Sequence, residues 1–159
     1  MKKVLLLFTL LPLFCFSQNI TKRELRKIIK ECIRINKARF ISDKDLILVA
    51  NNTDSSFFNT INLTVYTDRQ YDFCKWIEFC FLNKKNAYFK DCQACKEPST
   101  CYSTTEKNIY NYKIIKENKE LTIEFKNKFE CRLFQILETK RDKSKRITEI
   151  LITQTINKI

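Results

Sequence analysis

Glycine and histidine are both absent from this chain of 159 residues. Without glycine, the chain cannot form a Walker loop, a GxGxxG dinucleotide-binding turn, a GxSxG nucleophile elbow or a standard EF-hand loop. Without histidine, it cannot form a Ser-His-Asp or Cys-His catalytic arrangement, or a zinc site with an imidazole ligand. The two absences exclude the commonest nucleotide-binding, hydrolytic and metal-dependent classes, and we expect no cofactor and no metal.

Only one long apolar run occurs, and it lies at the start of the chain. Two lysines precede the apolar residues of positions 4–16. This run is shorter than the roughly twenty residues that a membrane-spanning helix needs, and no other hydrophobic span follows. We therefore expect residues 1–17 to be a cleaved export signal and no transmembrane span in the protein.

The expected cleavage site follows Ser17. Cys15 and Ser17 place small residues at the two positions that signal peptidases read before a cut at Gln18. A lipoprotein, acylated at Cys15, is the alternative, but Phe14 is bulky where a small residue normally precedes such a cysteine. The sequence thus predicts a single exported domain over residues 18–159, periplasmic or secreted.

Residues 21–36 have the pattern of an amphipathic helix. Thr21 and Glu24 are spaced as in a capping box, where the two residues satisfy each other's backbone N–H groups. At about 100° per residue, one side of this helix is apolar and is expected to pack on the rest of the domain. The apolar side carries Leu25, Ile28, Ile29, Cys32 and Ile35.

Negative charge is scarce, with 18 acidic residues against 30 basic ones and a net charge of +12. The excess is concentrated in two segments, 22–39 and 140–146. Such a surface suits an anionic polysaccharide, a lipid head group or an acidic protein, and less well a nucleic acid. The alternative is a solvated helix face without a partner. The candidate binding residues are Arg23, Arg26, Lys27, Lys30, Arg34, Lys37, Lys140, Arg141, Lys143, Lys145 and Arg146.

After residue 40, apolar residues alternate with polar ones, which indicates strands, and the short connections favour antiparallel neighbours. We expect an α+β domain. In it, one N-terminal amphipathic helix packs on a roughly six- to eight-stranded antiparallel meander sheet, shaped as a cystatin-like grip or a half-open barrel. Since glycine is absent, Asn and Asp are expected to supply any positive-φ turn positions. The expected strands span 46–50, 61–65, 71–82, 87–92, 109–116, 121–126, 129–139 and 147–156.

Seven cysteines remain after the expected cleavage, and an exported chain meets an oxidising compartment in which disulfides persist. The closest pair is Cys92 and Cys95, followed by Cys101 in a polar loop. Structural disulfides are the leading interpretation. A zinc site completed by Cys74 or Cys80 and a redox-active Cys92–Cys95 pair are the alternatives. The disulfide candidates are Cys74, Cys95, Cys80, Cys92, Cys101, Cys32 and Cys131.

A hairpin register predicts one of these pairs. If Lys84 and Lys85 form a two-residue turn, Cys74 lies opposite Cys95, at the separation that a cross-strand disulfide needs. We then expect Cys92 or Cys80 to pair with Cys101. Cys32 and Cys131 either pair with each other or remain buried thiols.

The same hairpin carries two further candidate chemistries. In this register Glu78 faces Asp91, and two carboxylates that meet in this way can share a proton. Its aromatic residues alternate with lysines, as in proteins that stack single-stranded bases, although the core of a small sheet is the commoner role. These aromatic residues are Phe73, Trp76, Phe79, Phe81, Tyr88 and Phe89.

The sequence as a whole favours a non-enzymatic, exported interaction module of the bacterial envelope or medium, stabilised by disulfides, that binds an anionic partner through its basic residues. An enzyme without histidine, using either a thiol–disulfide pair or carboxylates, is one alternative. A structural accessory domain without a ligand is another.

Overall fold

The protein consists of one helix and nine strands within the part of the chain that the computed structural model describes, residues 20–37, 48–51, 60–65, 73–95, 98–102 and 108–158. The expected signal peptide lies outside these residues. The elements are α1 (Lys22–Lys37), β1 (Leu48–Asn51), β2 (Thr60–Thr64), β3 (Lys75–Phe81), β4 (Asn86–Gln93), β5 (Thr100–Tyr102), β6 (Tyr110–Glu117), β7 (Glu120–Lys126), β8 (Glu130–Arg141) and β9 (Ile147–Lys158).

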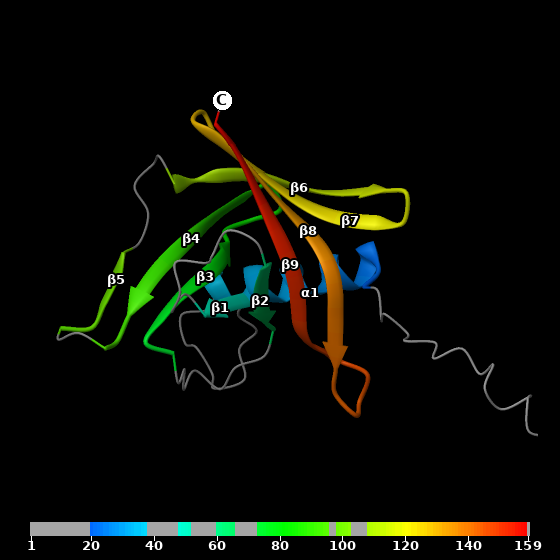
Figure 1. Ribbon diagram of the computed structural model, residues 1–159, viewed down its shortest axis with the longest axis horizontal. Helices are drawn as coiled ribbons and strands as arrows, with labels where there is room; N and C mark the ends of the chain where they lie inside the picture. The colour runs from blue at the N-terminus through cyan, green and yellow to red at the C-terminus, as the bar shows by residue number, and fades with distance from the viewer. Residues whose placement is uncertain are drawn as a thin grey trace, which may run out of the picture.

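Eight of the strands form a closed antiparallel barrel (Figure 1). The order around the barrel is β3-β1-β2-β9-β8-β7-β6-β4, and pairing between β3 and β4 closes the ring. The ninth strand, β5, is short and pairs with the end of β4 that β6 does not reach. All strand pairs are antiparallel, as the short connections predicted.

The expected open meander sheet, whether a cystatin-like grip or a half-open barrel, is therefore wrong. The early strand β1 inserts between β3 and β2, and β2 pairs in turn with the last strand, β9. These pairings join segments that are distant in the sequence, so neither turn lengths nor hydrophobic periodicity indicate them. Closure gives each of the eight barrel strands a partner on both sides, although β4 and β6 pair over only two residues each, and it reduces the exposed backbone of an open sheet.

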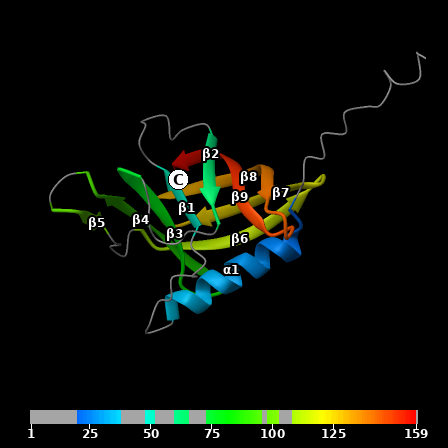
Figure 2. The ribbon, with the colours of Figure 1, turned by 90° about the horizontal axis from the view of Figure 1, so that it is seen from below.

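The helix packs its apolar side into the same core as the barrel. Figure 2 shows α1 running along one side of the strands, and its nearest strand by contact is β3. As expected from the sequence, the apolar side of the helix is buried and joins one hydrophobic cluster with the strands. The helix residues in this cluster are Leu25, Ile28, Ile29 and Cys32.

Aromatic rings fill one part of this core. The rings of Phe79 and Phe89 meet edge to face at 4.8 Å between centroids, and Phe125 and Phe134 lie 5.4 Å apart in the same way. Each ring contributes a large buried apolar area and a favourable edge-to-face contact. Because Phe79, Phe125 and Phe134 are buried, these rings serve the core and are not available to stack on a base.

Among the described residues, three in turns adopt positive φ angles, namely Asn118, Lys119 and Lys145. Asn118 and Lys119 form the two-residue turn between β6 and β7, where a tight hairpin needs positive φ at both positions. The expectation that Asn and Asp supply such positions therefore holds only for Asn118. Lysine takes the other two positions, at a conformational cost that the surrounding hairpins offset.

Candidate functional site

An ion pair connects the start of the helix to the β8–β9 hairpin. The guanidinium Nη1 of Arg141 donates a hydrogen bond to Glu24 Oε1 at 2.9 Å, and the same nitrogen donates to the carbonyl oxygen of Lys145 at 3.1 Å. Figure 2 shows the β8–β9 turn beside the N-terminal end of α1. Glu24 and Arg141 are 117 residues apart in the sequence. Their contact therefore brings the two predicted basic segments next to each other at this point.

Glu24 also caps the helix. Its Oε2 atom accepts hydrogen bonds from the backbone N–H and the hydroxyl of Thr21, both at 2.8 Å, and its own N–H donates to Thr21 Oγ1 at 3.1 Å. Burial raises the pKa of the Glu24 carboxyl, but the hydrogen bonds from Arg141 and Thr21 lower it more, to about 2. Glu24 therefore stays ionised across the physiological pH range and holds Arg141 in place.

A row of exposed cations follows α1 on the side away from the core. Arg34 lies 3.8 Å from Glu31 in a largely exposed pair, which contributes little. Within the described residues, no acidic partner neutralises the other four side chains of this row. The exposed residues are Arg23, Arg26, Lys27, Lys30 and Arg34, and the side chain of Lys37 lies outside the described part of the structure.

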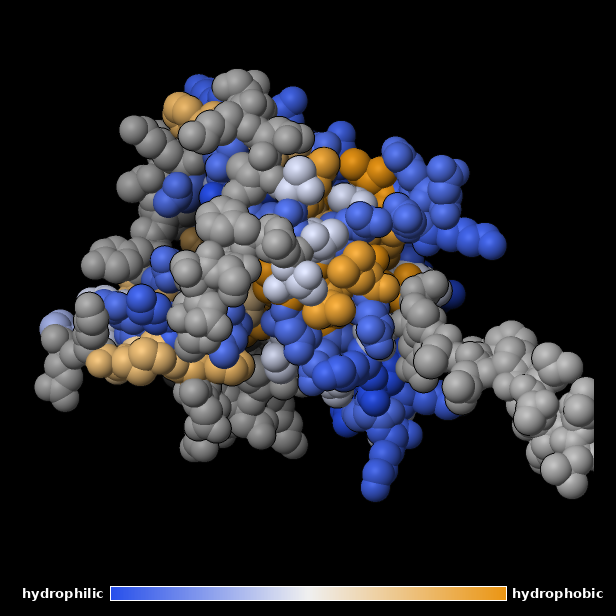
Figure 3. Space-filling view, viewed as in Figure 1, coloured by the Kyte–Doolittle hydropathy of each residue, from blue (hydrophilic) through white to orange (hydrophobic). Residues whose placement is uncertain are grey.

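The β8–β9 hairpin supplies the second set of cations, and part of its charge is neutralised. Lys140 Nζ lies 2.7 Å from Glu149 Oε2, and Arg146 Nε lies 3.0 Å from Asp142 Oδ2. Lys143 and Lys145 are exposed, and no ion pair of the described residues includes them. Figure 3 shows hydrophilic side chains gathered around this turn, at the lower end of the view.

We refer to the exposed cations of α1 and of the β8–β9 turn that have no acidic partner among the described residues as the basic surface. The sequence predicted the two segments of this surface separately. It did not reveal the Glu24–Arg141 contact that joins them. Glu24 was recognisable only as a capping residue, because nothing local links it to Arg141. The basic surface consists of Arg23, Arg26, Lys27, Lys30, Lys143 and Lys145.

Two disulfides stabilise the β3–β4–β5 region. Cys74 pairs with Cys95, and Cys92 pairs with Cys101. Both pairs are among those expected from the sequence, but the register used to derive the first is wrong by one residue. The turn contains three residues, 83–85, because Asn83 Oδ1 accepts hydrogen bonds from the N–H groups of Lys85 and Asn86.

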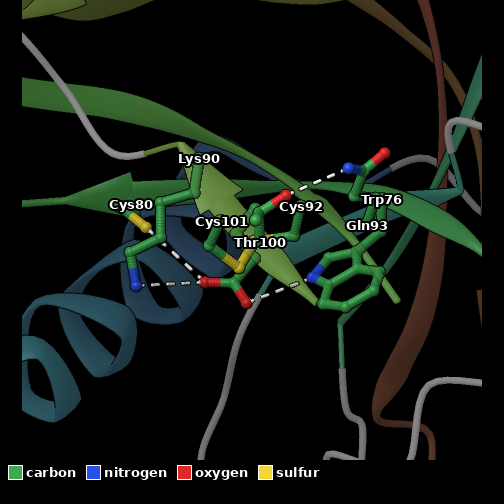
Figure 4. The surroundings of a disulfide bond; sticks show 8 residues. Trp76, Cys80, Lys90, Cys92, Gln93, Thr100 and Cys101 are labelled. Atoms are coloured by element: carbon green, nitrogen blue, oxygen red, sulfur yellow. Dashed lines mark hydrogen bonds and ion pairs between the residues drawn. A yellow bond between two sulfur atoms is a disulfide. The ribbon is translucent and has the colours of Figure 1, made fainter. Parts of the chain in front are cut away.

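This register change alters the expected carboxylate pair. Glu78 lies opposite Lys90, whereas Asp91 lies opposite Ile77 and therefore on the other face of the sheet. Lys90 Nζ lies 3.4 Å from Glu78 Oε2, and Trp76 Nε1 donates to Glu78 Oε1 at 3.3 Å (Figure 4). The predicted meeting of Glu78 and Asp91 is wrong, and Glu78 is neutralised by a cation instead.

The described cysteines outside the disulfides are Cys32, Cys80 and Cys131. Burial raises the pKa of the Cys32 thiol to about 12, and burial also raises the pKa of Cys80, to about 11. A thiolate is the reactive form, so neither thiol is activated. Cys92 and Cys95 belong to different disulfides, so the structure does not contain the Cys92–Cys95 bond of the redox alternative. The same two disulfides occupy the sulfurs of Cys92, Cys95 and Cys101, which the zinc alternative needs as ligands.

The structure also contains a groove that the sequence analysis missed. It lies along β6 and β7 and the turn that follows, with Ile109 and Phe129 exposed at one end and Lys113 and Lys126 along its length. The signal in the sequence is weak, because Lys126-Asn127-Lys128-Phe129 resembles any charged turn. Only the pairing of β6 with β7 brings Ile109 next to this turn.

Comparison with known proteins gives no match to a protein family, to a curated protein or to a solved structure. Among the described residues, no helix has the length and apolar character that a membrane crossing requires. The same residues contain no group of three or more metal-ligating side chains.

Proposed function

We propose that the protein is an exported, non-enzymatic interaction module that binds an anionic polysaccharide through its basic surface. The observation that carries this proposal is the Glu24–Arg141 ion pair, which holds the β8–β9 hairpin and its cations beside the first turn of the helix. A single polyanion can then contact both sets. Neither set needs a conformational change, since secondary structure already holds both.

The spacing of the helix cations favours a polymer with repeated charges. Arg23, Arg26 or Lys27, Lys30 and Arg34 recur at nearly one turn of helix. At 1.5 Å per residue, the row extends for about 16 Å along the helix axis. Exposed cations attract polyanions over a distance of about 10 Å at 0.1 M salt, and the attraction weakens as salt is added.

Two further observations are compatible with an exported protein. The disulfides Cys74–Cys95 and Cys92–Cys101 suit an oxidising compartment, which is where such bonds persist. The expected signal peptide over residues 1–17 would direct the chain there. Mass spectrometry of the exported protein tests this part. We expect the N-terminus at Gln18, whereas an intact Met1 or a lipid on Cys15 would contradict it.

Binding to heparin, a sulfated polysaccharide, tests the proposed function. The wild type should bind at low salt, and the variant R26E/K30E should bind at least about tenfold more weakly. The matched control is K75E/K128E, which reverses two exposed lysines at the opposite ends of β3 and β8 from the basic surface and should bind as the wild type does. Vesicles with anionic lipids serve as the competing ligand class.

Three outcomes would contradict the proposal. If the wild-type protein does not bind heparin at low salt, the proposed polysaccharide binding is wrong. Equal loss in the R26E/K30E and K75E/K128E variants would mean that net charge, not the basic surface, drives binding. If the protein binds anionic vesicles more tightly than heparin, its ligand is a lipid head group and not a polysaccharide.

A further inference from the structure

A groove with a volume of about 930 Å³ lies on the outside of the barrel, and the basic surface does not extend into it. This volume is in the range of small-molecule sites, roughly 300–1,000 Å³. Its walls come from β6, β7 and the turn between β7 and β8. Because these strands pair along their whole length, the groove has a rigid floor.

The two ends of the groove differ in polarity. At one end Ile109 and Phe129 are 39% and 55% exposed, which is unusual for large apolar side chains on a barrel that buries most of its others. Four residues further along the strands, about 13 Å away, Lys113 pairs with Glu124 at 3.0 Å. Lys126 lies between the two ends.

The groove carries an excess of positive charge. Glu124 neutralises Lys113, whereas Lys126 and Lys128 are exposed and no ion pair of the described residues includes them. A ligand that satisfies the whole groove therefore has an apolar part, for Ile109 and Phe129, and a negative group that reaches the two lysines. Neither a bare anion nor a neutral chain provides both.

We propose that this groove binds a single-chain amphiphile with an anionic head group, of the fatty-acid class. The chain lies against Ile109 and Phe129, and the carboxylate contacts Lys126 and Lys128. This site is separate from the basic surface and does not depend on the proposed polysaccharide binding.

Cys131 provides a reporter beside the site. It lies directly opposite Lys126 on the neighbouring strand, so their Cβ atoms are about 5 Å apart. Its thiol is free and partly exposed. A ligand bound non-covalently at Lys126 should therefore cover the Cys131 thiol and slow its alkylation.

Calorimetric titration with dodecanoate, kept below its micelle concentration, tests the proposal. Dodecanoate should bind the wild type, while acetate and dodecyl maltoside should each bind at least about tenfold more weakly, because each lacks one part of the ligand. The variants K126E/K128E and F129S should lower the affinity for dodecanoate to a similar extent. The matched control R26E/K30E should retain wild-type affinity, even if the same variant no longer binds heparin.

Alkylation of wild-type Cys131 by iodoacetamide gives a second readout that requires no variant. Dodecanoate should slow this reaction severalfold, and acetate should not. The proposal is overturned if dodecanoate does not bind, if dodecyl maltoside binds as tightly, or if K126E/K128E retains wild-type affinity. Loss of dodecanoate binding in R26E/K30E would assign the ligand to the basic surface instead.

Discussion

Glu24 and Arg141 form an ion pair at 2.9 Å that ties the first turn of α1 to the end of β8. The side chain of Arg141 is mostly buried, at 18% exposure, and its charge is neutralised by Glu24. The neighbouring cations of the helix and the hairpin are exposed instead. One partly buried contact thus sets the relative position of two exposed charged segments.

The first prediction concerns the stability that this ion pair supplies. Glu24→Gln should lower the free energy of unfolding at pH 7 by about 1 kcal/mol, a value kept small because the Glu24 side chain is 38% exposed. The folded-state pKa of Glu24, about 2, lies below the ordinary value of 4.5 for a glutamate side chain. Its contribution is therefore complete above pH 4.5 and is lost as the pH falls towards 2.

Chemical denaturation of the wild type and the E24Q variant between pH 7 and pH 2 measures this effect. The difference between the two proteins should shrink as the pH decreases. Glu31→Gln, on the same helix but in a weak exposed pair with Arg34, is the control and should change stability by no more than a few tenths of a kcal/mol. A pH-independent difference for E24Q would show that its effect does not come from the ionised carboxylate.

The second prediction tests the orientation of the helix. Ile29 is 3% exposed and Lys30, the next residue, is exposed. Ile29→Asp should destabilise the protein by about 3–5 kcal/mol, because it places an uncompensated charge in the core. Lys30→Asp should have little effect on thermal unfolding, and the opposite ranking of the two variants would reverse the assigned faces.

How much the sequence predicts depends on whether the signal is local. The helix was predicted at 21–36 and is observed at Lys22–Lys37, because Thr21, Glu24 and the 3.6-residue apolar period all lie within it. Seven of the eight expected strands match observed strands to within two residues at each end, because the alternation of apolar and polar residues is also a local signal. The eighth is expected at 71–82, whereas the structure has β3 at Lys75–Phe81. The short strand β5 was missed, because a three-residue strand in a polar stretch has no periodicity to detect.

Non-local features were not predictable in the same way. Nothing in residues 48–51 indicates that β1 inserts between β2 and β3, and this placement is part of what closes the barrel. The hairpin register failed because the Asn83 side chain turns the chain with three residues where the sequence also permits two. A shift of one residue exchanges the two faces, so Glu78 meets Lys90 and not Asp91.

The third prediction concerns the disulfides. Replacing Cys92 and Cys101 together by Ala should lower the free energy of unfolding by about 2–3 kcal/mol, since the bond closes a short loop. The same replacement at Cys74 and Cys95 should cost slightly more, because 21 residues separate these cysteines against 9 for the other pair. Urea unfolding measures both. Peptide mapping without reduction should recover these two pairs, and a Cys92–Cys95 peptide would contradict the connectivity.

The fourth prediction concerns the three described cysteines that lie outside the disulfides. Iodoacetamide at pH 8 should modify Cys131 in the native protein and leave Cys32 and Cys80 intact, because both are buried and their pKa values of about 12 and about 11 keep them protonated. Unfolding in urea without reductant should expose all three. Mass spectrometry of the digested protein distinguishes the sites, and rapid native labelling of Cys32 would contradict the packing of α1.

The central claim is that the cations of α1 and those of the β8–β9 hairpin act as one anion-binding surface. The most direct test is the salt dependence of heparin affinity for the wild type, for R26E/K30E and for K143E/K145E. If both segments contact the polyanion, each variant should weaken binding and reduce the slope of log affinity against log salt concentration by about one to two. A K143E/K145E variant with wild-type affinity and slope would contradict the claim, since the hairpin would then lie outside the contact.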